Sequence, residues 1–404
     1  MGGILLPLRI AVIGGGIGGL TAAAAMLRAG LDVHVYEQAG ELSEVGAGVA
    51  LGPNALRLLH RLGLEERLAA VAVSLTGYDM RRGRDGAVVF ETHSSGPLRD
   101  MRTVTVHRAH LLEALAELVP PARIHLDRRC TRVEERAAGA RVTFQDGSTA
   151  DADVVVGADG IHSVVRSMRH DDRPVFSGMV AYRGLVPMDR LDMLDEERDR
   201  IVFWFGPRRH VVTFAVAGGA LMNVVAFVPA DDGWAEESWT APGNVADMLR
   251  HFEGWEPRVQ AVLRTLDVTM RWALYDREPL PSWSTERVTL LGDAAHAMLP
   301  HQGQGAVQSI EDAWMLARCL GRAEPDTAGE WLRLYERLRR PRAARVQEAS
   351  RLTGDIYALD DAEEQERRVP SAVATRGEWL WSYDADVAFE EALGEAAPDG
   401  RPGR

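Results

Sequence analysis

The sequence predicts an α/β protein in which a mainly parallel sheet is interrupted by an antiparallel sheet and followed by helices. Three observations predict this fold. Residues 9–36 contain a strand, a glycine-rich turn, a helix and a second strand, which is how a parallel sheet begins. Two later apolar strands, at 154–156 and 287–291, each run into a turn that carries an aspartate. Between them, residues 178–272 consist mainly of short β-rich runs.

Length and composition limit the class of protein. The 404 residues suit two closely packed domains, and the formal net charge of −13 disfavours nucleic acid as a partner. No apolar run approaches the ~20 residues that span a bilayer. The apolar start at 4–8 is interpreted as the lead-in to the first strand, so we expect no stable membrane association. Cys130 and Cys319 form no metal-binding or redox motif, which favours a cytoplasmic protein without a metal.

The first elements open the parallel sheet. Arg9–Ile13 is a short apolar and β-branched run that predicts a buried strand. Leu20–Ala29 is rich in alanine and leucine and contains no helix breaker, so it predicts a helix that ends at Gly30. Val33–Tyr36 predicts the second strand, which Glu37 closes.

The remaining elements follow in chain order. Helices are predicted at 56–68 and 111–118, and strands at 141–144 and 154–156 around the turn Asp146-Gly147. The runs 202–205, 211–216 and 222–228 predict the antiparallel sheet, and the strand at 287–291 returns to the first sheet. A long helix is expected from near Gly305 to about Leu320. Helices fill most of the remainder, and 396–404 is predicted as a frayed tail.

The glycine-rich turn has the spacing of a dinucleotide-binding motif. Gly14, Gly16 and Gly19 fit G-x-G-x-x-G. The first permits a tight turn, the second lets the backbone approach a pyrophosphate, and the third lets the helix pack on the strand. Glu37 lies 18 residues beyond Gly19, where a carboxylate accepts hydrogen bonds from ribose hydroxyls. The alternative is a glycine turn without a ligand, and the pattern alone leaves NAD, NADP and FAD open.

Two later segments narrow the choice of dinucleotide. Asp159 and Gly160 follow one apolar strand, and Gly292 and Asp293 follow another. Both aspartates therefore stand at carboxyl ends of strands, where open α/β sheets bind ligands. Together with the glycine motif, and in this order, they resemble the motifs of single-component (group A) flavin-dependent aromatic hydroxylases along nearly the whole chain.

The resemblance implies a Rossmann-like FAD-binding domain of the GR2 type with an inserted, mainly antiparallel β-sheet substrate domain and C-terminal helices. The first part of the FAD-binding domain is expected at 1–177, with some substrate-side segments near 75–105, and its second part at 276–350. The substrate domain is expected at 178–275, and the C-terminal helices and tail at 351–404.

The resemblance also implies which residues hold the cofactor. In the family the Asp159 motif serves both FAD and the nicotinamide donor, and Asp293 lies on the ribityl chain of FAD. Backbone amides between Pro300 and Gly305 would lie near the flavin ring, where the positive end of a helix favours the anionic reduced flavin. The expected cofactor-binding residues are Gly14, Gly16, Ile17, Gly19, Glu37, Gln38, Ala47, Gly48, Val49, Arg108, Asp159, Gly160, Arg166, Asp293, Pro300, Gly305 and Ala306.

The substrate side looks closest to hydroxylases of salicylate, 3-hydroxybenzoate and 6-hydroxynicotinate. The supporting segments are 46–49, 52–55, 182–184 and 204–210. His210 falls where those enzymes keep a histidine that helps to deprotonate the substrate hydroxyl, so a catalytic role is expected for it. The expected substrate residues are Arg183, Trp204 and Phe214.

Two positions depart from that pattern. Phe214 stands in place of a tyrosine and Ala50 in place of a histidine, so the site is more apolar and a tyrosine relay is lost. These losses argue against 6-hydroxynicotinate as the substrate. Structural alternatives stay open: His210 on a solvated strand edge, Arg183 in an ion pair between domains, and Trp204 and Phe214 in a core or pocket wall. His296 is interpreted as a hydrogen-bonding residue at a helix start rather than a proton carrier.

These features predict an FAD-dependent NAD(P)H monooxygenase. FAD is expected to be tightly bound, and NADH or NADPH to bind transiently. Oxygen from O2 would pass through a flavin C4a-hydroperoxide to a phenolic or N-heteroaromatic small molecule, with decarboxylation left open. The alternatives are hydroxylation or epoxidation of a larger natural product, an NAD-dependent dehydrogenase, and a flavin-binding protein without hydroxylase activity. Monomer and homodimer are both left open.

Overall fold

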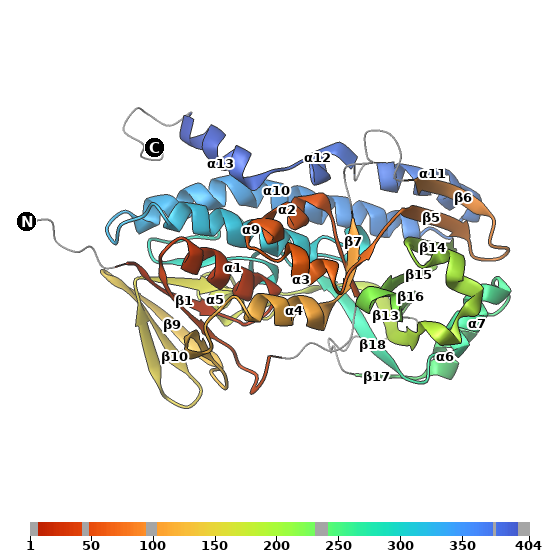
Figure 1. The fold of residues 1–404 in the computed structure, drawn as a ribbon, viewed down its shortest axis with the longest axis horizontal. Coiled ribbons are helices and arrows are strands. Elements are labelled where there is room, and N and C mark those ends of the chain that lie inside the picture. The colour runs from red at the N-terminus through yellow and green to blue at the C-terminus, as the bar shows by residue number, and fades with distance from the viewer. Residues whose placement is uncertain (1–6, 43–47, 94–102, 231–240, 375–376, 395–404) are drawn as a thin grey trace, which may run out of the picture.

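The computed structural model describes residues 7–42, 48–93, 103–230, 241–374 and 377–394 (Figure 1). A five-stranded parallel sheet has the strand order β19-β12-β1-β2-β8. These strands span Val288–Leu290, Val154–Gly157, Arg9–Ile13, Asp32–Tyr36 and Ile124–His125. The predicted strands at the chain start and at 154–156 are confirmed. All of β12 and four of the five residues of β1 are buried, as is typical of parallel strands covered on both faces.

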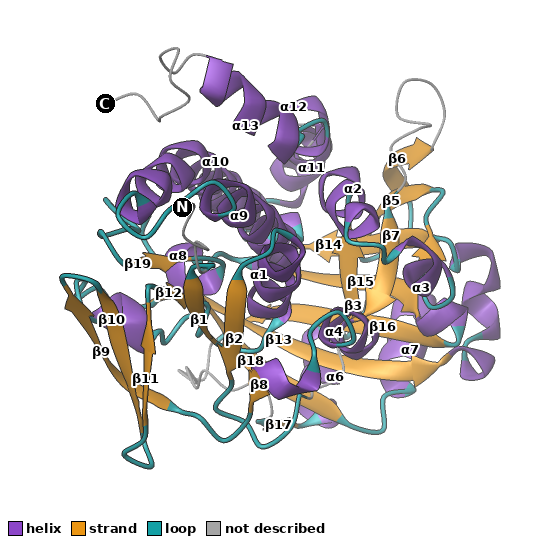
Figure 2. Cartoon of the chain, turned by 60° about the vertical axis from the view of Figure 1, so that its left-hand side comes forward, coloured by secondary structure: helices purple, strands orange, loops and turns teal. Residues whose placement is uncertain are grey.

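Two helices cover this sheet side by side, α1 (Ile17–Arg28) and α9 (Gly305–Leu320) (Figure 2). A Cβ on Gly18 would lie 3.0 Å from the Cβ of Ser309, so glycine lets the helices approach closely near their N-termini. The predicted helix after the glycine turn is confirmed, although it begins at Ile17 rather than Leu20. The prediction for α9 is confirmed at both ends.

The second large sheet has eight strands in the order β17-β18-β13-β16-β15-β14-β5-β6. Every neighbouring pair is antiparallel except β14 with β5. The mainly antiparallel sheet is therefore confirmed. In the order given, its strands are Pro242–Gly243, Thr269–Asp276, Val175–Pro187, Leu221–Pro229, Arg209–Val216, Arg200–Gly206, Gly77–Arg82 and Val88–His93.

The two faces of this sheet bury different cores. On one face, α6 (Val245–His251) and α7 (Pro257–Arg264) pack against a core that includes Trp204. The opposite face carries Phe203, Phe214 and Phe227 and also receives side chains from outside the sheet. Two of these are Ile356 and Tyr357, at the end of the 30-residue helix α10 (Ala328–Tyr357).

The chain ends in a helical layer that runs along the molecule above both sheets (Figure 1). After α10 come α11 (Ala362–Ala374), α12 (Gly377–Trp381) and α13 (Ala385–Gly394). None of the described helices is long and apolar enough to cross a lipid bilayer. The tail predicted at 396–404 lies outside the described residues.

Smaller elements differ from the prediction. The helix expected at 56–68 is divided into α2 (Pro53–Arg61) and α3 (Glu65–Ala69), because Gly63 adopts a φ of +90° between them. The turn Asp146-Gly147 joins β10 (Gly139–Phe144) to β11 (Thr149–Ala152), and not to β12 as predicted. These two strands and β9 (Cys130–Arg136) form a separate sheet, while β12 pairs in parallel with β1.

Three short strands form a further antiparallel sheet, which the sequence did not predict. They are β3 (Gly48–Leu51), β4 (Val73–Ser74) and β7 (Val104–His107). Helix α4 (Arg108–Ala116) follows β7, which confirms the predicted helix with an earlier start. The short helices α5 (Val164–Ser167) and α8 (Asp293–His296) follow β12 and β19, at the two aspartate turns.

Candidate active site

The carboxyl ends of the parallel strands bring the predicted cofactor motifs together. Gly14, at the end of β1, has a φ of +111°, and its N–H donates to the carbonyl of Tyr36 at 2.9 Å. A Cβ on Gly14 would overlap the carbonyl oxygen of Ala158, the residue before Asp159. A Cβ on Gly19 would in turn overlap the carbonyl oxygen of Gly14. Only glycine therefore lets the first turn lie against both α1 and the Asp159 turn.

The N-terminus of α1 has the features of a phosphate site. Gly16 precedes the helix, and a Cβ added there would meet no atom within 4 Å. No side chain caps the helix, and no acidic residue lies in its first turn. The backbone amides that begin at Ile17, together with the positive end of the helix, can therefore bind an anion. This open cradle fits the pyrophosphate of a dinucleotide.

Glu37 lies beside the same turn, just beyond β2. Its two carboxylate oxygens accept the N–H of Gly15 at 2.6 Å and of Ala39 at 2.8 Å. Each oxygen keeps a second lone pair for a hydroxyl donor, so the carboxylate can still accept from a ribose. The neighbouring Gln38 is exposed.

The Asp159 turn caps α5. The carboxylate of Asp159 accepts the hydroxyl of Ser163 at 2.5 Å and the N–H of Val164 at 2.7 Å. Burial raises its pKa, while the Ser163 hydroxyl and nearby backbone amides oppose that rise. Gly160 follows with a φ of +76°, which glycine adopts without strain.

Arg166 lies between the two aspartate turns. Its guanidinium is buried, pairs with Asp172, and donates to the carbonyls of Ala294 at 3.1 Å and Ala295 at 3.3 Å. These contacts tie α5 to α8, and so tie one aspartate turn to the other. Arg166 therefore positions the two turns relative to each other, and its contact with the cofactor stays a prediction.

The second aspartate turn is held from α9. Gly292 has a φ of +58°, and its N–H donates to Asp312 at 2.9 Å. The other contact of that carboxylate oxygen is His296 Nε2 at 2.5 Å, so His296 serves as the hydrogen-bonding residue that the sequence favoured. Burial would raise the pKa of Asp312, but His296 and Arg339 hold it at about 2. These contacts hold the turn that carries Asp293 in place.

The start of α9 faces Asp293. Oδ1 of Asp293 lies 3.9 Å from the position that a Cβ on Gly305 would take. Pro300 opens a short 3₁₀ turn (Pro300–Gln302), Gly303 follows with a φ of +64°, and Ala306 lies in the first turn of α9. As in α1, this first turn has no capping side chain and no acidic residue. Its amides and helix-end potential suit the electron-rich edge of a reduced flavin.

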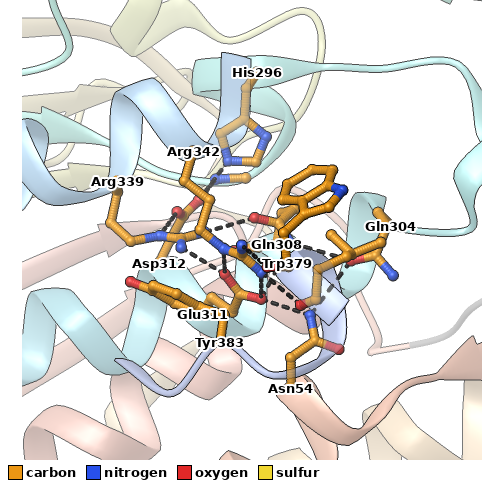
Figure 3. Close-up of polar contacts among 12 residues, drawn as sticks. Asn54, His296, Gln304, Gln308, Glu311, Asp312, Arg339, Arg342, Trp379 and Tyr383 are labelled. Atoms are coloured by element: carbon orange, nitrogen blue, oxygen red, sulfur yellow. Dashed lines mark hydrogen bonds and ion pairs between the residues drawn. The ribbon is translucent and has the colours of Figure 1, made fainter. Parts of the chain in front are cut away.

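A buried network of charges stands behind this turn (Figure 3). Glu311 pairs with Arg339 at 2.5 Å and with Arg342 at 2.7 Å, and it accepts Asn54 Nδ2 at 2.6 Å. Asp312 pairs with Arg339 at 2.8 Å. Glu311, Asp312 and Arg339 are completely buried. Sequence reasoning missed this network, although two adjacent acids in the apolar helix α9 were a signal for it, because buried acids need partners.

The other predicted cofactor residues lie nearby on β3 and α4. Gly48 begins β3, and its N–H donates to Asn223 Oδ1 at 2.9 Å. Val49 is partly buried against the core of the parallel-sheet domain, and Arg108 begins α4. Ala47 lies outside the described residues.

The predicted substrate residues divide between the two faces of the eight-stranded sheet. Phe214 lies on the face that receives the end of α10, and its ring would overlap a Cβ on Gly48. Arg183 follows Ala181 by two residues on β13 and so shares that face, with its guanidinium 4.8 Å from the ring centre of Trp272.

Trp204 lies on the other face. Its Nε1 donates to Glu256 at 2.7 Å inside the core beneath α6 and α7. This position favours the core alternative over substrate contact, because side chains alternate between faces along a strand and Trp204 has the opposite parity to Phe203 and Phe205.

His210 is on an interior strand and only 2 % exposed, so the solvated-edge alternative is excluded. It shares its face with Phe214. Its ring stacks on Phe227 with 4.2 Å between ring centres and lies 5.7 Å from His301, which belongs to the turn that begins at Pro300. Burial, with a smaller contribution from His301, lowers the pKa of His210 well below its ordinary value. The imidazole is therefore neutral at neutral pH and can accept a proton.

Comparison with known proteins identifies the family of the chain. The family described as "FAD binding domain" matches residues 8–350. A 3-amino-4-hydroxybenzoate 2-monooxygenase of Streptomyces platensis is 42% identical over 386 residues, which is 94% of this chain and 96% of that protein. A salicylate hydroxylase of Pseudomonas putida is 38% identical, covering 96% and 95%. A 6-hydroxynicotinate 3-monooxygenase of Bordetella bronchiseptica is 37% identical, covering 85% and 90%.

Solved structures agree with these relatives. A salicylate hydroxylase in complex with its substrate superposes with a TM-score of 0.82 at 32% identity, over 95% of this chain and 97% of that one. HpxO of Klebsiella pneumoniae, complexed with FAD and uric acid, also gives a TM-score of 0.82, at 29% identity and the same coverage.

Proposed function

The chain belongs to the group A flavin-dependent aromatic hydroxylases, and on that premise we propose that it hydroxylates a small aromatic acid that carries a phenolic hydroxyl. It is an FAD-dependent monooxygenase, and NAD(P)H is the cosubstrate typical of its family. The observation that carries the substrate class is that a neutral imidazole, His210 on β15, and a cation, Arg183 on β13, lie on the same buried face of the sheet.

The chain's own residues supply binding and positioning. When bound, FAD supplies the redox chemistry that takes a hydride from NAD(P)H and activates O2. The amides that begin at Ile17 would hold its pyrophosphate, Glu37 its ribose, and the turn that ends at Gly305 its flavin ring. The apolar face that includes Phe214 keeps water from the reacting atoms.

Two side chains then distinguish the substrate. The neutral imidazole of His210 takes the proton of the phenolic hydroxyl, and the resulting phenolate is the more reactive nucleophile. Arg183 offers its guanidinium to the carboxylate of the ring. The relatives named for 3-amino-4-hydroxybenzoate and salicylate act on compounds that carry both groups, which supports this assignment.

The test is the consumption of NAD(P)H by the FAD-loaded enzyme with a panel of aromatic acids. We expect 3-amino-4-hydroxybenzoate and salicylate to stimulate it and to yield hydroxylated products by mass spectrometry. 6-Hydroxynicotinate is expected to be weaker, because Phe214 and Ala50 offer no polar group to its ring. Benzoate, which lacks the hydroxyl, is the control. Stimulation by benzoate equal to that by salicylate would contradict the proposed role of the hydroxyl. Activity only with larger phenols would contradict the small-acid assignment and support a larger natural product as the substrate.

Variants of the same enzyme assign the two roles. His210→Asn should lower kcat/KM by about 10²- to 10⁴-fold, because proton transfer is lost. Arg183→Met should raise KM more than it lowers kcat, because it removes a binding contact. Arg271→Met is the matched control, since Arg271 pairs with Tyr182 on the opposite face of the sheet and should leave both constants unchanged.

The state of the enzyme in the cell is a further part of the proposal. We propose that the enzyme is cytoplasmic and is a monomer or homodimer. The cytoplasmic location is supported by Cys130 and Cys319, which are buried and take part in no disulfide. Light scattering of the FAD-loaded protein and fractionation of the source cells measure these two properties. Recovery of the protein outside the cytoplasm would contradict the proposed location.

A further inference from the structure

The imidazole of His210 is enclosed by side chains from three other elements. Phe227, on the neighbouring strand β16, stacks on it with 4.2 Å between ring centres and an interplanar angle of 14°. Tyr357, from the end of α10, lies 4.6 Å away at 45°. His301 lies at 5.7 Å. His210 and Tyr357 are each only 2 % exposed, so these rings separate the imidazole from bulk water.

The end of α10 is fixed on the hairpin that carries His210. The N–H of Arg208, two residues before His210, donates to the carbonyl of Leu359 at 3.0 Å. Nε2 of Gln365 donates to the carbonyl of Tyr357 at 2.9 Å and to that of Gly206 at 3.2 Å. The C-terminal segment therefore bonds directly to the loop between β14 and β15, which sets the place of the Tyr357 ring.

The same helix end also contacts the turn on the predicted flavin side. A Cβ on Gly354, one turn before Tyr357, would lie 2.8 Å from Cδ2 of His301. Tyr357 and His301 are themselves 5.9 Å apart, nearly edge to face. The end of α10 thus packs between the strand that carries His210 and the turn that leads into α9.

We propose that Tyr357 is a positioning residue for His210, which it holds against Phe227 and shields from water through its ring. The inference rests on the proposed role of His210 as proton acceptor. The role is assigned to the ring of Tyr357, because its contact with His210 is between the two rings, whose centres lie 4.6 Å apart at an interplanar angle of 45°. Phe214 provides no hydroxyl to orient His210, so the position of the imidazole depends on the end of α10.

The effect on proton transfer follows from the surroundings of the imidazole. Among the described residues, the titratable side chains that contact the His210 ring are His301 and Tyr357. Phe203 and Phe227 make the adjoining strands apolar. Desolvation disfavours the charged imidazolium, so His210 stays in its neutral form to lower pH and binds protons less strongly than a solvated imidazole. Opening the enclosure to water would restore its ordinary affinity for protons.

The experiment compares Tyr357→Phe with Tyr357→Ala in the FAD-loaded protein. The pKa of the His210 ring is measured by NMR titration of labelled histidine, with the signal assigned by its loss in His210→Gln. Tyr357→Phe should keep the wild-type pKa, and Tyr357→Ala should raise it by about one unit or more as water enters. Where the alanine variant does not fold, Tyr357→Leu, which lacks the ring face, should show the same upward shift.

Kinetics give the second readout. The acidic limb of kcat/KM should move to higher pH in the alanine or leucine variant and return to its wild-type position in Tyr357→Phe. Tyr275→Ala, in the core on the opposite face of the sheet, is the control for a general loss of packing and should shift neither value. An unchanged His210 pKa in the alanine or leucine variant, or the same shift in Tyr357→Phe, would overturn the proposal. The NMR result stands whether or not the enzyme turns over phenolic acids, so failure of the proposed function is seen separately, in the substrate panel.

Discussion

At the residue scale, Gly16 is the position where the fold leaves space for the cofactor. Its φ of −74° is open to any residue, so backbone strain does not require glycine there. The reason for glycine is instead the empty space in front of the α1 amides. This separates Gly16 from Gly14, whose φ of +111° and contact with Ala158 require glycine for folding.

Gly16→Asp should therefore weaken FAD binding about tenfold or more, because a carboxylate at the helix start opposes the pyrophosphate. Gly16→Asn has nearly the same size without the charge and should weaken binding less. Both side chains are favourable helix caps, so α1 itself should not lose stability. Titration of FAD into the apoprotein by flavin fluorescence measures the difference, and equal loss in the two variants would show that volume alone decides it.

Strand parity is the second lesson at this scale. His210 and Phe214 are four residues apart on β15 and face the same core, while Trp204 faces the other. The sequence showed that side chains alternate along β14. It did not show which of the two faces lies toward the turns on the predicted flavin side. That face is defined by Leu299 and Tyr357, which come from outside the sheet.

At the element scale, the contact between α9 and α10 is unusual because it buries several charges. Glu311 accepts from Asn54 of α2 and pairs with Arg339 and Arg342 of α10. Arg342 also donates to the carbonyls of Trp379 at 3.1 Å and Leu380 at 2.9 Å, so the C-terminal helices attach through the same group. The Glu311 carboxylate and its partner Arg342 therefore connect α2, α9, α10 and α12.

Glu311→Gln should destabilise the protein by about 3–5 kcal/mol, because it leaves buried arginine charge without its partner. Glu364→Gln is the matched control. Its partner Arg367 has a side chain that is 71 % exposed, so loss of this ion pair should change stability far less than Glu311→Gln does. Denaturant unfolding at a fixed FAD concentration measures both variants. Equal stability of Glu311→Gln and wild type would show that the network is not needed for the fold.

At the scale of the whole molecule, the two sheets are joined through long-range packing instead of a flexible linker. Helix α10 contacts α9 over the parallel sheet and ends against the eight-stranded sheet at Tyr357. Strand β13 follows α5 directly in the chain and pairs with β16 and β18. A ligand that orders the parallel sheet should therefore stabilise the entire chain.

FAD should raise the free energy of unfolding, by about 2.7 kcal/mol when free FAD is 100 times its dissociation constant. FMN, which lacks the adenylate and the second phosphate, should give much less, because the α1 cradle and Glu37 would have no partner. Thermal unfolding of the apoprotein with each flavin measures this. Equal stabilisation by FMN would contradict the assignment of the α1 turn to a dinucleotide.

The sequence by itself determined the parts of the protein that depend on near neighbours. The strand β1, the glycine turn, α1 and α9 follow from short apolar periods and glycine spacing, and the three aligned motifs identify the family and its cofactor. Backbone geometry and local packing act over a few residues, so they leave a readable pattern.

Only the tertiary structure decided which distant residues meet. It pairs β14 with β5, places Trp204 in the core beneath α6 and α7, brings Arg166 to α8, and packs Tyr357 against His210. It also supplies Glu311 with partners from α2 and α10. These contacts join segments separated by long stretches of chain, and their energy comes from packing and desolvation in the folded state, which no local periodicity encodes.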